Sequence, residues 1–198
     1  MRTSDFNYDL PEELIAQHPP AVRGTSRLLS LDGNTGDIRH LSFPDLPTLL
    51  KPGDCLVINN TKVIPARLLG ARKATGAAVE ILLLKRLDKE RWETIVRPGK
   101  KCRVGHEVEF IPGKLSCVIE EVLDTGNRIV RFSFEGIWEE ILDEAGTMPL
   151  PPYIHEQLED KERYQTVYAK TPGSAAAPTA GLHFTDDLLE RIKAMGVS

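Results

Sequence analysis

Short apolar runs dominate the middle of the chain. Residues 66–134 contain about six runs rich in Val, Ile, Leu and Phe, and turn-forming residues separate them. Closely spaced strands with such turns predict a small antiparallel barrel or sandwich. The turn signals are Thr75-Gly76, Asp88-Lys89-Glu90, Pro98-Gly99, Pro112-Gly113 and Thr125-Gly126.

The amino-terminal flank has a different pattern. Residues 27–32 and 37–43 are predicted to be two strands joined by a Gly-Asn-Thr-Gly turn, which makes a hairpin. Asp9 followed by Glu12 resembles a capping box that starts a short helix, and the prolines after His18 stop it. The apolar run at residues 55–60 is predicted to be a buried strand that ends in polar residues.

Helical signals return in the carboxyl-terminal flank. Apolar residues recur at helical spacing over residues 137–146, and a glycine ends the run. Thr185, with two aspartates after it, caps an amphipathic helix that ends near Gly196. Between these helices the sequence predicts an extended segment, a short helix and a small-residue loop, at residues 148–154, 160–169 and 172–184.

The simplest assembly of these elements is an α/β domain that carries an inserted small antiparallel β-barrel domain. Residues 1–64 and 138–198 would form the α/β domain. Residues 65–137 would form the barrel.

Composition fits an ordinary globular protein. Hydrophobic residues make up 41% of the 198 residues and charged residues 27%. The amino terminus is charged and no apolar run approaches transmembrane length, so we expect a cytoplasmic protein with no membrane partner. Three widely spaced cysteines, Cys55, Cys102 and Cys117, suit neither disulfides nor a zinc site and are expected to be buried.

Charge is distributed unevenly along the chain. The net charge is -4, but residues 62–103 hold 12 basic and 4 acidic side chains, and the segments on both sides are acidic. Such a positive segment could supply contacts to phosphates. Charge alone favours a well-solvated surface, because isolated charge asymmetry is common.

Several common catalytic motifs do not occur. There is no P-loop, no G-x-G-x-x-G turn, no H-E-x-x-H and no paired C-x-x-C, and the five histidines lack metal-ligand spacing, so we assign no metal.

Two stretches are chemically unusual. Asn59, Asn60 and Thr61 end the predicted buried strand, where open α/β sheets often bind ligands, although a plain turn is the alternative. Residues 163–184 combine Ala, Gly, Pro and Ser with aromatic residues and a histidine. Small residues permit close approach of the backbone to a ligand, and a flexible linker is the alternative. We expect the two stretches to converge around one cavity.

Six blocks in order carry a family resemblance: FNYDLPEELIAQHP, SRLL, GDCLVINNTKVIPARL, MPLPPYI, RYQTVYA and AAPTAGLHFT, which begin at residues 6, 26, 53, 148, 163 and 176. Together they resemble the S-adenosylmethionine:tRNA ribosyltransferase-isomerase family of queuosine biosynthesis. Members of that family continue past the helix that ends near residue 198, so the resemblance implies an amino-terminal portion.

The resemblance also implies the substrates. They are S-adenosylmethionine, as a co-substrate and without any prosthetic group, and a tRNA that carries aminomethyl-deazaguanine at the wobble position. The products would be epoxyqueuosine, adenine and methionine.

The resemblance then suggests residue roles. His183 is the first candidate for acid-base chemistry, with orientation of adenine as the alternative, and Tyr164 and Tyr168 could stack on a base or face the sulfonium. The residues expected to bind S-adenosylmethionine are Asn59, Asn60, Thr61, Arg67, Pro178, Thr179, Ala180, Gly181 and Phe184. The residues expected to contact tRNA are Arg97, Lys100, Lys101 and Arg103.

Two rival hypotheses belong to other classes. A non-catalytic RNA-binding module would bind RNA whether or not S-adenosylmethionine is present. A conventional methyltransferase would release S-adenosylhomocysteine, and the missing glycine-rich fingerprint disfavours it.

Overall fold

The computed structural model describes residues 1–151, 153–155 and 160–198. Contacts among residues divide the chain into two compact units. The first unit comprises Met1–Leu56, Leu150–Arg163 and Leu182–Ser198, and the second comprises Val57–Pro149 and Tyr164–Gly181. The domain boundaries after residues 64 and 137 stay a prediction.

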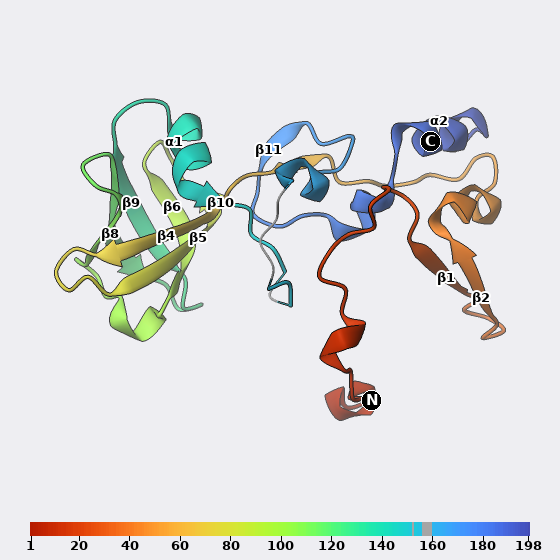
Figure 1. Ribbon diagram of the computed structural model, residues 1–198, viewed down its shortest axis with the longest axis horizontal. Coiled ribbons are helices and arrows are strands. Elements are labelled where there is room, and N and C mark those ends of the chain that lie inside the picture. Colours follow the sequence, from red (N-terminus) through yellow and green to blue (C-terminus); the bar gives the residue numbers. More distant parts are fainter. Residues whose placement is uncertain (152, 156–159) are drawn as a thin grey trace. The chain divides into compact units, whose positions relative to one another are not determined.

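Six antiparallel strands of the second unit close into a barrel (Figure 1). The order around it is β4-β5-β6-β9-β8-β7, and Ala71 and Arg72 of β4 pair with Glu109 and Val108 of β7 to complete the circle. The predicted barrel is therefore confirmed, with a strand for each apolar run. The strands are β4 (Arg67–Arg72), β5 (Ala78–Arg86), β6 (Arg91–Arg97), β7 (Glu107–Ile111), β8 (Leu115–Val122) and β9 (Arg128–Phe134).

Side chains from alternate positions of the strands fill the interior of the barrel. Buried and more exposed positions alternate along β5, β6 and β8, which is the period of a sheet with one face inward. Gly70 allows β4 to meet β7, because a Cβ at this position would lie 2.5 Å from the carbonyl oxygen of Glu109. The side chains that are at most 1% exposed include Leu68, Ile81, Leu83, Val108, Ile119, Val130 and Phe132.

Helix α1 (Trp138–Ala145) packs on the barrel through Trp138, whose ring centroid lies 4.9 Å from that of Phe132 and 5.1 Å from that of Phe134. The helix confirms the prediction for residues 137–146. After it, β10 (Gly146–Thr147) pairs with the start of β4. A Cβ at Gly146 would lie 2.0 Å from the carbonyl oxygen of Pro65, so the chain enters and leaves the barrel at one place.

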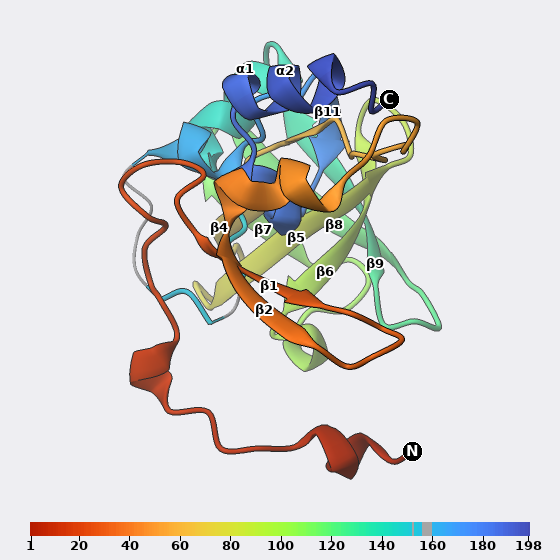
Figure 2. The ribbon, with the colours of Figure 1, turned by 90° about the vertical axis from the view of Figure 1, so that its right-hand side faces the viewer.

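The first unit contains the predicted hairpin, formed by β1 (Arg27–Leu31) and β2 (Ile38–Ser42). Figure 2 shows the hairpin running into the 3-10 helix η3 (Phe43–Leu49). Helix α2 (Asp186–Ala194) also follows the prediction, because the hydroxyl of Thr185 accepts a hydrogen bond from the N–H of Leu188 at 3.3 Å.

The remaining elements are short. Strands β3 (Thr61–Val63) and β11 (Thr171–Ser174) pair in parallel within the second unit. With the barrel and the helices, this pairing confirms the predicted class of an α/β domain with an inserted β-barrel. The other 3-10 helices are η1 (Thr3–Phe6), η2 (Glu12–Leu14), η4 (Gly99–Lys101), η5 (Lys161–Tyr164) and η6 (Thr179–His183).

Two predicted helices are wrong in extent. The segment that begins at Asp9 contains only η2, which buries no residue, and a short helix without a buried apolar face is not stable. Residues 160–169 contain only η5, and after it the side chain of Gln165 is bound to the backbone of Val63. The predicted loop at residues 172–184 contains most of β11 and all of η6, and residue 152 of the predicted extended segment lies outside the described residues.

The predicted strand at residues 55–60 is also wrong. No ladder forms along it among the residues that the structure describes, and Val57 is 89% exposed. A strand needs a continuous row of hydrogen bonds to a neighbour. Among the described residues, the backbone of this run bonds to another segment only at its two ends, where the N–H of Leu56 donates to the carbonyl oxygen of Ser198 at 2.8 Å and the carbonyl oxygen of Asn60 accepts from Lys170 and Thr171. Cys55 is exposed as a result, contrary to prediction.

Cys102 and Cys117 are buried in the barrel as predicted. Burial raises the pKa of the Cys117 thiol to about 12, so this cysteine behaves as a small apolar side chain. Among the helices described, none has the length and apolar character to cross a bilayer.

Candidate functional site

Two strands far apart in the sequence form the centre of the candidate site. Strands β3 and β11 pair in parallel, with Thr61 opposite Thr171. The carbonyl oxygen of Asn60 accepts hydrogen bonds from the N–H groups of Lys170 at 2.8 Å and Thr171 at 3.2 Å. The asparagine segment therefore lies beside the start of β11.

The side chain of Gln165 fixes this arrangement. Its Nε2 donates to the carbonyl oxygen of Val63 at 2.7 Å, and its Oε1 accepts from the N–H of Val63 at 2.9 Å. Both residues are buried, with 6% of Gln165 and 3% of Val63 exposed. A buried amide that is paired in both directions specifies one register.

Asn59 shapes the turn before β3. Its Oδ1 accepts hydrogen bonds from the N–H of Thr61 at 2.9 Å and from the hydroxyl of Thr61 at 2.7 Å. This is the geometry of the turn-forming alternative. Because those side chains bind each other, the Nδ2 of Asn59 and the exposed side chain of Asn60 are the polar groups that the turn could offer to a ligand.

The small-residue loop approaches Tyr168 closely. A Cβ at Gly181 would lie 2.3 Å from the hydroxyl of Tyr168 and 2.8 Å from Cγ2 of Thr166, so only glycine fits here. The N–H of Gly181 donates to the carbonyl oxygen of Pro178 at 2.7 Å, which closes the turn. Thr179 and Ala180 are exposed on this turn.

The side chains next to the small-residue loop are partly or fully buried. Burial raises the pKa of Tyr168, so its phenol stays protonated at neutral pH and can donate a hydrogen bond. The hydroxyl of Thr166 is buried without a partner in the described part of the chain. Tyr164 is also buried, with 9% exposed, so stacking on a base would require it to be uncovered.

Arg67 lies on β4, where its guanidinium pairs with Glu80 at 2.9 Å. Arg97 reaches the other oxygen of the same carboxylate at 3.8 Å. One carboxylate is therefore shared by two arginines, and the three side chains together carry one net positive charge. Lys100, Lys101 and Arg103 are exposed on and after η4, at one end of the barrel.

His183 and Phe184 belong to the first unit, where both pack on Phe43. The ring centroids lie 5.1 Å apart in each pair, tilted for His183 and edge-on for Phe184. Phe43 and Phe184 are buried, and His183 is half-buried. This aromatic packing fixes the position of the imidazole.

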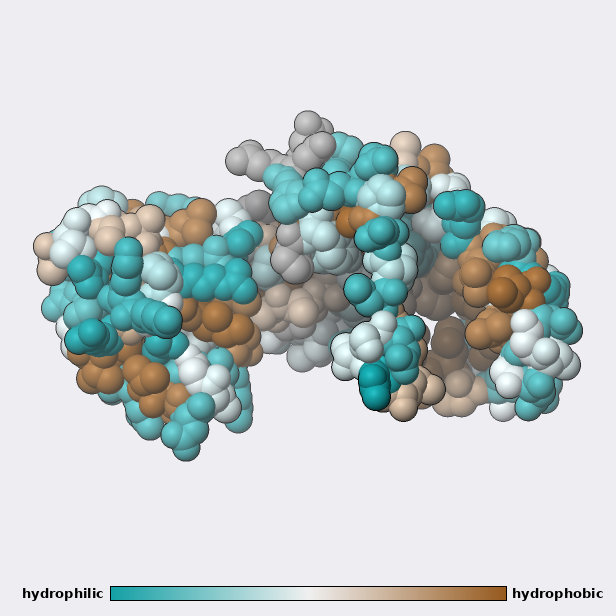
Figure 3. Space-filling view, turned by 90° about the horizontal axis from the view of Figure 1, so that it is seen from below, coloured by the Kyte–Doolittle hydropathy of each residue, from teal (hydrophilic) through white to brown (hydrophobic). Residues whose placement is uncertain are grey.

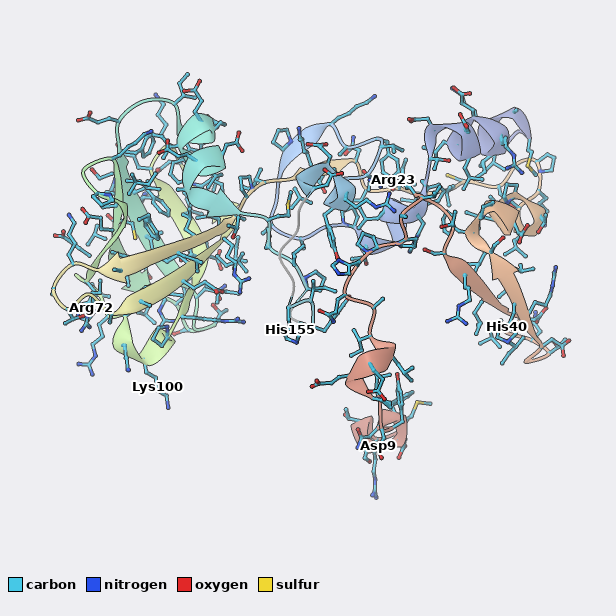
Figure 4. The ribbon with its side chains drawn as sticks, in the orientation of Figure 1. Asp9, Arg23, His40, Arg72, Lys100 and His155 are labelled. Atoms are coloured by element: carbon cyan, nitrogen blue, oxygen red, sulfur yellow. The ribbon has the colours of Figure 1, made fainter. Side chains whose placement is uncertain are left out.

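Arg23, which is labelled in Figure 4, holds the chain around His183 through hydrogen bonds to backbone carbonyl oxygens. Its Nη1 donates to the carbonyl oxygen of Leu182 at 2.9 Å, and its Nη2 donates to those of Glu162 at 3.2 Å and Arg163 at 3.3 Å. Arg163 in turn donates to the carbonyl oxygen of Pro20. These bonds tie together three stretches of the first unit.

The same arginines act on the charge of His183. Burial lowers the pKa of its imidazole, and the positive charges of Arg163 and then Arg23 lower it further. The imidazole is therefore neutral at neutral pH and can accept a proton.

The predicted site residues fall into two groups. Asn59, Asn60, Thr61, Arg67, Tyr164, Tyr168 and Pro178–Gly181 belong to the second unit, and His183 and Phe184 to the first. Arg23 and Gln165 were not predicted from the sequence, because neither lies in a local pattern that signals its long-range bonds. In the described ranges, no three His, Cys, Asp or Glu side chains gather as a metal site would require.

Comparison with known proteins gives consistent matches. The sequence profile of the family described as "Queuosine biosynthesis protein" matches residues 3–198. Relatives from Symbiobacterium thermophilum, Desulfitobacterium hafniense and Clostridioides difficile are 59%, 57% and 56% identical to this chain over 197 residues. Each is named S-adenosylmethionine:tRNA ribosyltransferase-isomerase.

These matches cover all or nearly all of this chain but only part of each relative. Each alignment covers 100% of this chain and 58% of the relative, so the chain spans little more than half the length of these proteins. A crystal structure of an S-adenosylmethionine tRNA ribosyltransferase from Thermotoga maritima is 36% identical, with a TM-score of 0.38, and the match covers 98% of this chain and 55% of that one.

The environment of His183 predicts a measurable shift. In Arg163→Gln, the pKa of His183 should rise toward its ordinary value, because one repelling charge is removed, but stay below it, because burial remains the largest cause. Nuclear magnetic resonance titration of the imidazole measures this. Lys193→Gln, which removes an exposed charge from α2, is the control.

The pH dependence of stability follows from the same shift. The unfolded chain binds a proton at His183 more readily than the folded chain does. The contribution of the neutral His183 to the free energy of unfolding is therefore complete above the ordinary histidine pKa. That contribution declines as pH falls toward the lowered pKa.

In the magnetic resonance titration, an unchanged pKa of His183 in Arg163→Gln, or an equal rise in Lys193→Gln, would contradict the role given to Arg163.

Proposed function

The chain belongs to the queuosine biosynthesis protein family. We propose that it forms part of an enzyme that transfers the ribosyl group of S-adenosylmethionine to tRNA and isomerises that group. The acceptor is aminomethyl-deazaguanine at the wobble position, and the products are epoxyqueuosine in tRNA, adenine and methionine. A tRNA substrate implies action in the cytoplasm. The main support is the pairing of β3 with β11, which gathers the asparagine segment and the Tyr168–Gly181 loop within one unit.

The chemistry requires a base and an acid. The sulfonium acidifies the neighbouring ribose methylene, so a base can remove a proton to give an ylide, and adenine is then expelled. The deprotonated amine of the tRNA base attacks the unsaturated ribosyl sulfonium. Closure of the epoxide breaks the bond to sulfur and releases methionine.

His183 is the proposed proton-transfer group. A neutral imidazole held by Phe43 and by the arginine-bound backbone can accept a proton without first losing one. The alternative role, orientation of adenine by hydrogen bonding, uses the same neutral ring. Phe184 would provide an apolar wall next to it.

The residues of the second unit are proposed to bind S-adenosylmethionine. Tyr168 supplies an aromatic face, and its ring lies against Gly181. Tyr164 would supply a second face once the loop uncovers it, because its side chain is buried. Asn60, Asn59 and Thr61 would hold ribose hydroxyls or the methionine end. Pro178, Thr179 and Ala180 would let the backbone close over the ligand, and Arg67, which is paired with Glu80, would contribute through a partly neutralised charge.

The tRNA is proposed to contact the basic side chains near η4. Arg97, Lys100, Lys101 and Arg103 are all exposed, and phosphate contacts need exposed cations. This exposure also suits the second candidate function, a non-catalytic RNA-binding module. That module would bind RNA with the same affinity whether or not S-adenosylmethionine is present.

Product analysis tests the proposed reaction. We expect tRNA-dependent release of adenine from S-adenosylmethionine by this chain and by a hybrid in which it replaces the matching 197 residues of the Symbiobacterium thermophilum relative. His183→Gln should lower the rate by about 10²- to 10⁴-fold if the imidazole transfers a proton. His40→Gln, on the exposed strand β2, should leave the rate unchanged.

Other products would exclude the proposal. Release of S-adenosylhomocysteine would indicate a methyltransferase. Binding of RNA with no adenine released by either protein would indicate the binding module.

Salt titration tests the tRNA contacts of the η4 loop. Changing Lys100, Lys101 and Arg103 together to glutamine should flatten the log-log dependence of tRNA affinity on salt, by a little under one unit for each phosphate that no longer meets a cation. The control changes three exposed lysines elsewhere, Lys51, Lys89 and Lys193. Equal slopes for the two triple variants would remove the proposed role.

A further inference from the structure

A hollow lies at the η4 end of the barrel, between the β4–β5 turn and the start of β7. It is open to solvent, has a volume of about 490 Å³ and borders the loop that carries Lys100 and Lys101. Figure 4 shows Arg72 and Lys100 at this same end of the barrel. The residues that line the hollow are Arg72, Lys73, Ala74, Gly105, His106 and Glu107.

The guanidinium of Arg72 is held on two sides. Its Nε donates to the hydroxyl of Thr75 at 2.9 Å, and its Nη1 donates to the carbonyl oxygen of Lys101 at 3.0 Å. These bonds fix the plane of the guanidinium and tie the β4–β5 turn to η4. The third nitrogen, Nη2, makes no hydrogen bond within the part of the chain that the structure describes.

His106 presents a second donor to the hollow. Its Nδ1 lies 3.2 Å from the N–H of Arg103 and 3.4 Å from Nη1 of Arg72. Two donors that point at Nδ1 favour its role as an acceptor, and together they outweigh its contact of 3.2 Å with the carbonyl oxygen of Lys101. The proton therefore resides on Nε2, which has no partner among the residues described.

The charges around the hollow are strongly positive. Residues 72–76 and 99–107 contain five basic side chains and one acidic side chain, Glu107. The carboxylate of Glu107 is already paired with the ammonium of Lys73 at 3.1 Å. Figure 3, seen from the side on which η4 lies, shows hydrophilic side chains over much of this part of the barrel.

We propose that this hollow binds a phosphodiester group of an RNA backbone. Arg72 donates from Nη2 and His106 donates from Nε2, and Lys73 adds a cation at the rim whose charge Glu107 partly offsets. The exposed cations of the η4 loop continue beyond the hollow, as a ligand with further phosphates on both sides requires. The inference deepens the proposed function, from which it takes tRNA as the RNA.

Arg72 then has two roles. Its fork contacts the phosphate, and its bond to Lys101 holds the η4 loop so that Lys100 and Arg103 face the same strand of RNA. A lysine in its place would keep the charge but lose the bond that positions the loop.

Salt titration of tRNA binding by the 198-residue chain tests the site. Lys73→Gln should reduce the log-log slope by at most a little under one unit, because glutamine carries no charge and Glu107 already offsets part of the charge of Lys73. Arg72→Lys should weaken binding by more than threefold with little change in slope, because the charge remains. Lys89→Gln, at the β5–β6 turn at the other end of the barrel, should match the unchanged chain.

A second measurement tests the hollow without a substitution. Addition of tRNA should shift the nuclear magnetic resonance signals of the His106 ring, whereas the same phosphate concentration as inorganic phosphate should not. An equal shift with inorganic phosphate would indicate an isolated anion site and overturn the proposal. So would the absence of a shift with tRNA, a failure of the chain to bind tRNA, or equal slopes for Lys73→Gln and Lys89→Gln.

These outcomes separate the inference from the proposed reaction. Adenine release together with an unchanged slope would leave the reaction standing and remove the phosphate site. A reduced slope without adenine release would do the opposite.

Discussion

Two buried hydrogen bonds between Gln165 and the backbone of Val63 organise the second unit. They join residues 102 positions apart in the sequence, and the whole barrel lies between them along the chain. Loss of the glutamine amide would leave a backbone N–H and a backbone carbonyl buried without partners, at a cost of about 1–3 kcal/mol each. The parallel pairing of β3 with β11 continues from this point, and with it the position of the asparagine turn.

The barrel can be inserted here because it closes on itself. Its β4–β7 pairing removes the free sheet edges, and Gly146 returns the chain to the place where Pro65 leads into β4. The two connections to the barrel therefore lie together, and the flanking segments can pair as if the barrel were absent. The barrel is left free to present its far end, with Arg72 and the η4 loop, to a partner.

Short sequence patterns correctly predicted the elements that depend on residues close together in the sequence. The apolar runs gave the six barrel strands, the Gly-Asn-Thr-Gly turn gave the hairpin, and Thr185 gave the start of α2. The strand at residues 55–60 failed because strands depend on partners, and hydrophobicity does not show whether a partner is available. Arg23 and Gln165 were missed for a related reason, since each binds backbone groups that are remote in the sequence.

In the proposed function, the asparagine turn and the small-residue loop respond to one ligand. Hydrogen-deuterium exchange of the chain, with and without S-adenosylmethionine, tests it most directly. We expect the amides of residues 59–63 and those of residues 170–181 to gain protection together when the ligand is added. Protection of only one segment, or of neither, would contradict it.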